Sequence, residues 1–214
     1  SQLSMEYWRS YLWGAAPLFE LPLDAPRPAT QRSRAGECRV PWDHLVALSS
    51  ACRAHRATVT CALLSAWTAV LCVRSAQPEI VLGLPVSTRN SSLAVAALIT
   101  TLPLRIAHAT DGTVSACWRS VVGHLRAAMR HSAPTDAIVS AVGVATSSAF
   151  SPLFQTIVQF FDATHVYGTM LAPAEVKVDL EFFLAQEGDA YEARLLFDTQ
   201  LLHQETAQTV LDSV

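Results

Sequence analysis

Three places in this 214-residue chain carry side chains that could do chemistry: His108 with Asp111, His131, and Arg89. The stretch His108-Ala-Thr-Asp111-Gly112 has the residue order of a His-x-x-x-Asp-Gly motif, in which the histidine is a base for acyl transfer, but it is one residue too short. A spacing error of one residue re-aims both side chains, and Asp-Gly is a common turn pair. We therefore interpret this stretch as a loop.

His131 is the second candidate base, and it follows a helical pattern. A histidine near the C-terminus of a helix more often interacts with the helix dipole, so we favour a structural role. The seven histidines are dispersed, without the helical spacing to a second histidine or carboxylate that is typical of metal ligands. No GxSxG, Walker, GxGxxG or HExxH motif is present. The sequence thus indicates no self-sufficient catalytic group and no metal site.

Residues 79–90, Glu-Ile-Val-Leu-Gly-Leu-Pro-Val-Ser-Thr-Arg-Asn, have the pattern of a strand that ends at a possible site. The apolar run 80–82 predicts a buried strand, which Gly83 and Pro85 punctuate. Arg89 and Asn90 then follow in a predicted loop. A strand that delivers a cation at its end can form the wall of a site. The alternative, an ordinary buried strand followed by a surface arginine, stays open.

The composition indicates a chain that packs against something else. Hydrophobic residues make up 51% and charged residues 15%, compared with roughly 25% charged residues in typical globular chains. This leaves little polar surface for a free-standing monomer, so we expect a partner or a larger protein. The net charge is −3, with no Lys/Arg block and no basic face with interleaved aromatic residues. We therefore predict no nucleic-acid binding.

The cysteines and the apolar segments favour a cytosolic protein. Five scattered cysteines form no CxxC pair and are predicted to be buried, reduced thiols. Residues 57–73 are uncharged but at the short limit for a bilayer and contain four hydroxyl side chains, so we predict a buried helix. The amphipathic, charged first residues are unlike a signal peptide. We expect no membrane contact.

The remaining patterns predict an α/β fold. Four prolines make residues 17–30 an irregular strap over a surface. Pro103 makes one strand an edge or crossover segment, and apolar residues on both faces make residues 154–161 a central strand. Predicted helices cover residues 4–14 (capped by Ser4), 41–55 (starting at Pro41), 58–73, 113–129, 134–143 and 207–214. Predicted strands cover residues 34–40, 80–86, 98–107, 154–161 and a half-buried hairpin of 176–184 with 191–197.

Several segments, in this order, resemble the C-terminal half of a nonribosomal peptide synthetase condensation domain. Residues 7–28 resemble the stretch that joins the two lobes of that domain, and residues 80–90 resemble its Val-Gly-x-Pro-Val-x-x-Arg motif. Residues 101–105 resemble the end of its Gly-Phe-Phe-x-Asn-Thr-Leu-Pro-Leu-Arg motif, in which Ala96, Ala97 and Thr100 replace the glycine, the first aromatic residue and the asparagine. Residues 131–136 are a worn His-Gln-Asp-x-Pro-Phe-Glu motif, and residues 151–155 and 176–214 match the later family segments.

This resemblance implies a single chloramphenicol acetyltransferase-like lobe, with a mixed β-sheet packed by helices and a final β-hairpin and helix. Residues 1–32 would be the inter-lobe helix and proline-rich linker, and residues 33–214 the C-terminal lobe. In the family, two such lobes form a V with a tunnel between them. The catalytic His-His-x-x-x-Asp-Gly motif lies in the N-terminal lobe, and these 214 residues do not contain it. The resemblance therefore implies no catalytic residue in this chain.

The resemblance also implies which residues line the tunnel or the lobe interface. The family arginine that matches Arg89 pairs with the aspartate of the missing motif. No cofactor would be bound directly, and phosphopantetheine arms of carrier proteins would bring the substrates as thioesters. The implied partners are an N-terminal condensation lobe, an adjacent adenylation domain and a peptidyl carrier protein, in the cytoplasm. The candidate site residues are Gly83, Pro85, Val86, Arg89, Asn90, Thr101 and His131.

Three functions remain open at this point. The first is a non-catalytic lobe that acts as a structural platform. The second is the C-terminal half of an active condensation domain that an N-terminal lobe completes. The third, a stand-alone acyltransferase that uses coenzyme A, requires a histidine motif that the sequence lacks. In the first two cases we expect exposed apolar surface that associates or binds a hydrophobic dye.

Overall fold

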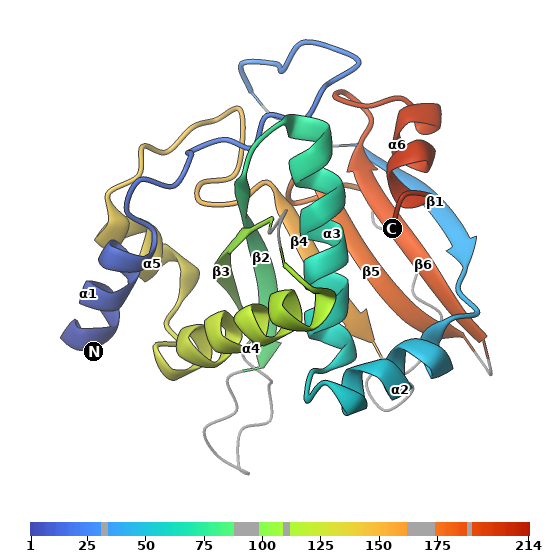
Figure 1. The fold of residues 1–214 in the computed structure, drawn as a ribbon. Helices are drawn as coiled ribbons and strands as arrows, with labels where there is room; N and C mark the ends of the chain where they lie inside the picture. The colour runs from blue at the N-terminus through green and yellow to red at the C-terminus, as the bar shows by residue number, and fades with distance from the viewer. Residues whose placement is uncertain (31–33, 88–98, 109–111, 162–173, 188–189) are drawn as a thin grey trace, which may run out of the picture.

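The computed structural model describes residues 1–30, 34–87, 99–108, 112–161, 174–187 and 190–214, which form one six-stranded mixed sheet and six helices (Figure 1). The predicted α/β fold class is confirmed. The strands are β1 (Ala35–Pro41), β2 (Glu79–Ser87), β3 (Ile99–Ala107), β4 (Thr156–Phe161), β5 (Leu180–Glu187) and β6 (Ala190–Asp198). The helices are α1 (Gln2–Tyr11), α2 (Leu45–Ala54), α3 (Val59–Ser75), α4 (Val114–Arg130), α5 (Thr135–Val142) and α6 (Gln204–Leu211).

The strand order β1-β6-β5-β4-β2-β3 confirms the predicted positions in the sheet. β4 is central and pairs in parallel with both β2 and β5, whereas the other neighbours are antiparallel. β3 is an edge strand, where Pro103 can lack a backbone N–H at little cost. β5 and β6 form the predicted antiparallel hairpin.

Helix α3 is the centre of the core, as its lack of a polar face predicts. It crosses the face of the sheet in front of β2 and β4 (Figure 1). Its Leu63, Leu64, Trp67 and Leu71 are at most 1% exposed. The Trp67 ring stacks on Phe182 of β5, with centroids 4.9 Å apart. The prediction of a buried helix over residues 57–73 is confirmed.

Among the described residues, no single helix is both long and apolar enough to cross a membrane. Only α2 and α3 taken together reach that length, and they are bent by 104° where they meet.

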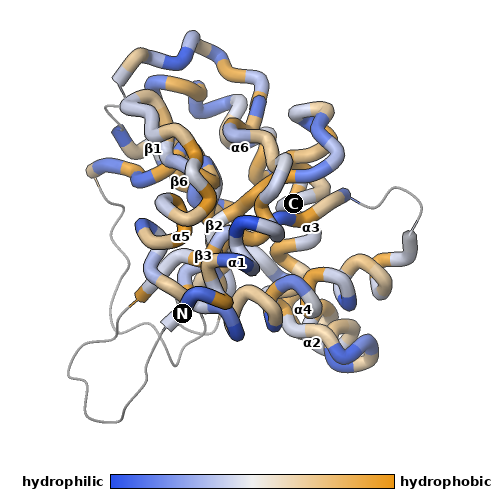
Figure 2. Tube along the Cα trace, turned by 90° about the vertical axis from the view of Figure 1, so that its left-hand side faces the viewer, coloured by the Kyte–Doolittle hydropathy of each residue, from blue (hydrophilic) through white to orange (hydrophobic). Residues whose placement is uncertain are grey.

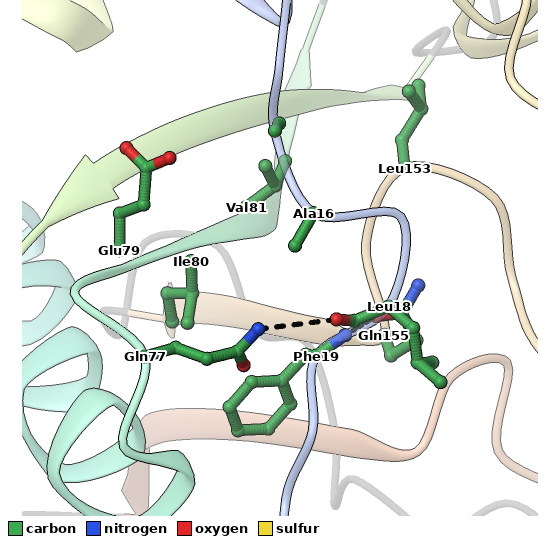
Figure 3. Close-up of a pocket in the computed structure, with 10 residues that line it drawn as sticks. Ala16, Leu18, Phe19, Gln77, Glu79, Ile80, Val81, Leu153 and Gln155 are labelled. Atoms are coloured by element: carbon green, nitrogen blue, oxygen red, sulfur yellow. Dashed lines mark hydrogen bonds between the residues drawn. The ribbon is translucent and has the colours of Figure 1, made fainter.

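The strap predicted over residues 17–30 is irregular as expected and is held by two glutamine side chains (Figure 3). Gln155 accepts from Phe19 N at 2.7 Å, and Gln77 donates to Leu18 O at 3.5 Å. The space left between the strap and β2 is about 10 Å³, which is room for about one water. Farther along, Arg27 donates to Asp179 Oδ1 at 2.9 Å. The strap therefore belongs to the packed structure, while the domain boundary expected near residue 32 stays a prediction.

Three predicted helix starts are wrong. The closing helix, predicted over residues 207–214, is α6 and begins three residues earlier, at Gln204. Helix α1 is capped by Ser1, whose Oγ accepts from Ser4 N at 3.3 Å, and it ends at Tyr11 before Gly14 is reached. Ser4 itself is buried inside the first turn. Pro41 is the last residue of β1, where an extended conformation also suits its fixed φ, and α2 begins at Leu45.

The half-buried character predicted for the hairpin is also wrong. β5 begins only at Leu180, and its two faces are both covered, because Phe183 and Ala185 form a second small core with Val176 and Leu196. Asp179, expected on a solvated face, is 4% exposed and pairs with Arg27 of the strap. The alternating pattern did not reveal that a distant segment covers this side.

Several large apolar side chains remain exposed, in line with the low charged fraction. They lie on different elements, among them α1, α3 and α4, and no described segment covers them. Those more than half exposed are Leu3, Trp13, Val46, Val73, Ile99, Val114 and Met129.

The cysteines permit a direct test of the packing. Burial raises the pKa of both Cys38 and Cys72 to about 11, so these thiols stay protonated and unreactive near neutral pH. Cys117 is only partly buried.

We expect iodoacetamide at pH 8 to label Cys117 first in the native protein, as mass spectrometry of peptides would show. In urea all five should react alike, and native labelling of Cys38 as fast as Cys117 would contradict the structure.

Candidate functional site

Three of the predicted site residues lie together on one face of the β2–β3 pair. Pro85 is paired directly with Thr101, and Gly83 lies two residues before Pro85 on the same face. Leu82 and Leu84, which alternate with Gly83 and Pro85 along β2, point to the opposite face. α3 covers that face, and both leucines are at most 6% exposed. Gly83 and Pro85 thus belong to the sheet face that α3 does not cover. Val86 follows Pro85 and is half-buried.

Gly83 shapes this face by having no side chain. A Cβ at this position would lie 2.7 Å from the ring of Phe154 and 2.8 Å from Cγ2 of Thr101. Both distances are shorter than atoms tolerate, so only glycine lets the Phe154 ring come this close to β2. Gly83 therefore supports the wall rather than opening a space in it.

Two threonine hydroxyls fix α5 against the same strand pair. Thr135 Oγ1 donates to Thr101 O at 2.8 Å, and Thr100 Oγ1 donates to Ala133 O at 3.2 Å. Thr100 stands where the family motif has asparagine, and in this position its short side chain still forms a hydrogen bond. The worn motifs at 100–101 and 131–136 are thus joined to each other in the folded chain.

His131 is placed by packing, as the sequence favoured. It follows the last residue of α4, and its ring stacks on Tyr7 with centroids 4.2 Å apart. Its backbone oxygen accepts from Trp8 Nε1 at 2.9 Å. These contacts attach α1 to the end of α4. A ring stacked in this way is poorly placed to act as a base for the β2–β3 face.

A polar network that sequence reasoning missed lies beside this attachment. The Tyr11 hydroxyl bonds to backbone N and O of Arg105 and lies 3.1 Å from His124 Nδ1. Arg105 in turn forms an ion pair with Glu79 on β2. Burial raises the pKa of Tyr11 and lowers the pKa of His124, so both groups are neutral at pH 7. The only sequence signal was Tyr11 on the apolar face of α1.

Other predicted residues lie outside the described part of the chain, namely Arg89, Asn90 and Asp111. His108 is described. It follows β3 in irregular structure, and its backbone N–H donates to Pro78 O at 2.8 Å. Among the described residues, no group of three or more His, Cys, Asp or Glu side chains is arranged to hold a metal ion.

A separate cavity of about 320 Å³ lies on the helical side of the sheet. It is bounded by Trp42, by α2, α3 and α4, and by Val214, and its lining is mostly apolar. His108 borders it, whereas Gly83, Pro85, Val86, Thr101 and His131 do not. Two side-chain groups of lining residues, Trp42 Nε1 and Thr68 Oγ1, are buried and have no hydrogen-bond partner among the described residues. This part of the packing is therefore less complete than the β2–β3 side.

Gly83→Ala tests the close contact with Phe154. We expect the free energy of unfolding to fall by about 1–3 kcal/mol, because the added methyl must displace a buried ring. The measurement is urea unfolding. The matched control is Gly123→Ala in α4, where a Cβ meets nothing within 4 Å, and there alanine should stabilise the helix by about 0.5–1 kcal/mol. Equal stability of Gly83→Ala and the wild type would count against this packing.

His124 should make stability depend on pH. Because burial lowers its pKa below the ordinary 6.5, its contribution is complete above that value and declines as the pH falls through the folded-state pKa. We expect urea unfolding to give lower stability at pH 5.5 than at pH 7.5, and His124→Gln to reduce this difference. An unaltered pH dependence in His124→Gln is the contrary result.

The sequence matches the Condensation domain family over residues 2–213. It is 31% identical to malpinin synthetase of Mortierella alpina over 219 aligned residues, which are 95% of this chain and 3% of that protein. It is 27% identical to cyclosporin synthetase of Tolypocladium inflatum over 226 aligned residues, which are 97% of this chain and 2% of that protein. The chain thus spans only a few per cent of the length of these relatives.

Solved structures show the same fold. The X-domain from teicoplanin biosynthesis superposes with a TM-score of 0.89 at 20% identity, over 99% of this chain and 52% of that one. The four-domain nonribosomal peptide synthetase holo-AB3403 superposes with a TM-score of 0.83 at 20% identity, over 98% of this chain and 19% of that one. Together with the match along residues 2–213, this shows that the chain belongs to the condensation-domain family of nonribosomal peptide synthetases.

Proposed function

We propose that this chain is the C-terminal lobe of a condensation domain, which forms no amide bond alone and acts as a structural and interface platform in a peptide assembly line. The observation that carries the proposal is the extent of the match, since a fold complete in one sheet covers about half of the X-domain chain. A two-lobed domain with one lobe equivalent to this chain accounts for that proportion. We expect the assembly to be cytoplasmic.

The positions of the histidines support the absence of a base from this lobe. Six of the seven histidines are described, and His165 lies outside the described residues. His131 stacks on Tyr7 and His124 bonds to Tyr11. His108 borders the cavity on the helical side of the sheet. The described histidines nearest in sequence to the worn motifs are therefore engaged elsewhere.

In a completed domain, the face with Gly83, Pro85 and Thr101 would form one wall of the tunnel. An amine on one phosphopantetheine arm attacks the thioester carbonyl on the other, the C–N bond forms, and the C–S bond breaks to release a thiol. A histidine of the N-terminal lobe would position or deprotonate the amine. The side chains of this chain would shape the channel and exclude water. Arg89 would pair with an aspartate of the other lobe.

A second candidate function is the C-terminal half of an active condensation domain. The intact packing at Gly83 favours it, because a wall that keeps glycine under Phe154 retains its shape. The partners that distinguish the two candidates are an N-terminal lobe for catalysis and an adjacent adenylation domain for a platform. A peptidyl carrier protein is needed only in the catalytic case.

The test is amide formation between two aminoacyl-loaded carrier domains, followed by mass spectrometry of the thioester products. We expect the 214 residues alone to give no product above background. Turnover by the chain alone overturns the proposal. Turnover that appears only when an N-terminal lobe with a His-His-x-x-x-Asp-Gly motif is added selects the second candidate. In that case Arg89→Ala should lower the rate while Arg34→Ala does not.

A further inference from the structure

The charges of this chain are divided sharply along its sequence. Residues 44–135 contain eight arginines and only two acidic residues, Glu79 and Asp111, a formal charge of +6. The rest of the chain contains seven basic and sixteen acidic residues, a formal charge of −9. The net charge of −3 is therefore the sum of a basic segment, residues 44–135, and an acidic remainder. Within the basic segment, Glu79 is already paired with Arg105.

The fold gathers five of these arginines on α4 and at the end of α2. Arg119, Arg126 and Arg130 are seven and four residues apart, so they lie within about 20° of one line along α4 and span about 16 Å. The ring of His55 packs against Trp118 with centroids 6.0 Å apart. This contact brings the end of α2 beside α4. We call Arg53, Arg56, Arg119, Arg126 and Arg130 the arginine face.

The sequence has neither a Lys/Arg block nor a basic face with interleaved aromatic residues, and the arginine face was not recognised from it. The five arginines form no block in the sequence, because 62 residues lie between Arg56 and Arg119. Those residues include α3 and the β2–β3 pair, after which the chain returns to α4. Figure 1 shows α2 and α4 both meeting the lower part of α3, and in Figure 2 the labels of α2 and α4 lie side by side in a region of the tube with hydrophilic positions. Only the folded chain brings the two sets together.

The arginines of the face are unengaged within the described part of the chain. All five are exposed, and the structure describes no side-chain hydrogen bond or ion pair for any of them. Six other described arginines behave differently, since each holds an acceptor of the same chain. These are Arg9, Arg27, Arg39, Arg74, Arg105 and Arg194. No side-chain bond is described for the exposed Arg34.

We propose that the arginine face docks an acidic helical surface of a partner protein domain. The proposal goes beyond the proposed function, because it needs neither the tunnel nor a second lobe. Protein interfaces are enriched in arginine and methionine and depleted in lysine. The face has no lysine, and Met129, which lies about 80° around α4 from the line of the three arginines, is 53% exposed next to it. A nucleic acid or an anionic membrane is disfavoured by the net charge of the chain, which is −3.

The spacing of the arginines defines the complementary surface. Carboxylates seven and four residues apart on a helix lie along one line, as the three arginines of α4 do. Charge pairs at an exposed interface fix register and raise the association rate, and they weaken as salt rises. The arginine face should therefore distinguish between acidic partners by the spacing of their carboxylates, and not by their net charge alone.

The experiment uses the full 214-residue chain and a labelled synthetic helical peptide that carries glutamates in this seven-and-four spacing. A scrambled peptide of equal composition is the control for net charge. Fluorescence anisotropy at low and high salt gives Kd for each. At low salt, we expect the peptide with the seven-and-four glutamate spacing to bind at least about tenfold tighter than the scrambled peptide. Its binding should weaken as the salt concentration rises.

The variant Arg119→Glu/Arg126→Glu/Arg130→Glu should weaken this binding by at least about tenfold. The milder triple change to Gln keeps the test valid if the charge reversal unfolds the chain, which circular dichroism reports. The matched control is Arg34→Glu, an exposed arginine outside the face, and it should leave Kd unchanged.

Equal binding of the ordered and scrambled peptides, or equal loss in Arg34→Glu, overturns the proposal. Tighter binding of a DNA duplex, or of phosphatidylserine vesicles, with the same dependence on the three arginines also overturns it, in favour of a polyanion or a membrane. None of these measurements requires amide formation, so a negative result here leaves the condensation assay to be judged separately.

Discussion

The enclosure of helix α3 is the constraint on which the rest of the structure depends. A helix of seventeen residues that is apolar on nearly every side has to be covered from several directions. Trp67 lies at its centre, stacked on Phe182 and donating to Thr156 Oγ1 at 2.9 Å. This hydrogen bond satisfies the one polar atom of this fully buried ring. The bond and the stack fix α3 over β4 and β5, and α2 and α4 are then arranged around it.

The contact between α3 and the sheet also decides which sheet face is available. Because α3 covers the face with Leu82 and Leu84, Gly83 and Pro85 are left on the other one. The alternation of a strand makes this division automatic. In the motif of residues 80–90, the leucines pack β2 against α3, and the alternating Gly83 and Pro85 form the surface on the other side of the sheet. The chemistry of that surface depends on what faces it.

Elements with a strong local pattern could be predicted from the sequence. The helix capped by Thr113 and the short helix ending at Gly143 are where their periodicity and caps place them, and the antiparallel hairpin is present although β5 begins four residues later than predicted. The wrong helix starts are local errors, but the larger errors concern residues whose surroundings come from far away. Asp179 looked solvated because its partner Arg27 is 152 positions distant, and the role of Tyr11 depends on Arg105 and His124. Local pattern carries no information about such partners. The arginine face was missed for the same reason.

The strap over residues 17–30 has a consequence for how the chain acquires its structure. Asp24 accepts hydrogen bonds from His203 N and Thr206 Oγ1, which lie 179 and 182 positions later. Trp8 bonds to a residue 123 positions later. Contacts of this sequence separation form slowly, since a long loop must close before they contribute. Residues 17–30 therefore wait for the last hairpin and helix, whereas the apolar side of α1 is covered once α5 and the end of α4 have formed. Part of the N-terminal segment of this lobe thus becomes ordered only after its last elements are present.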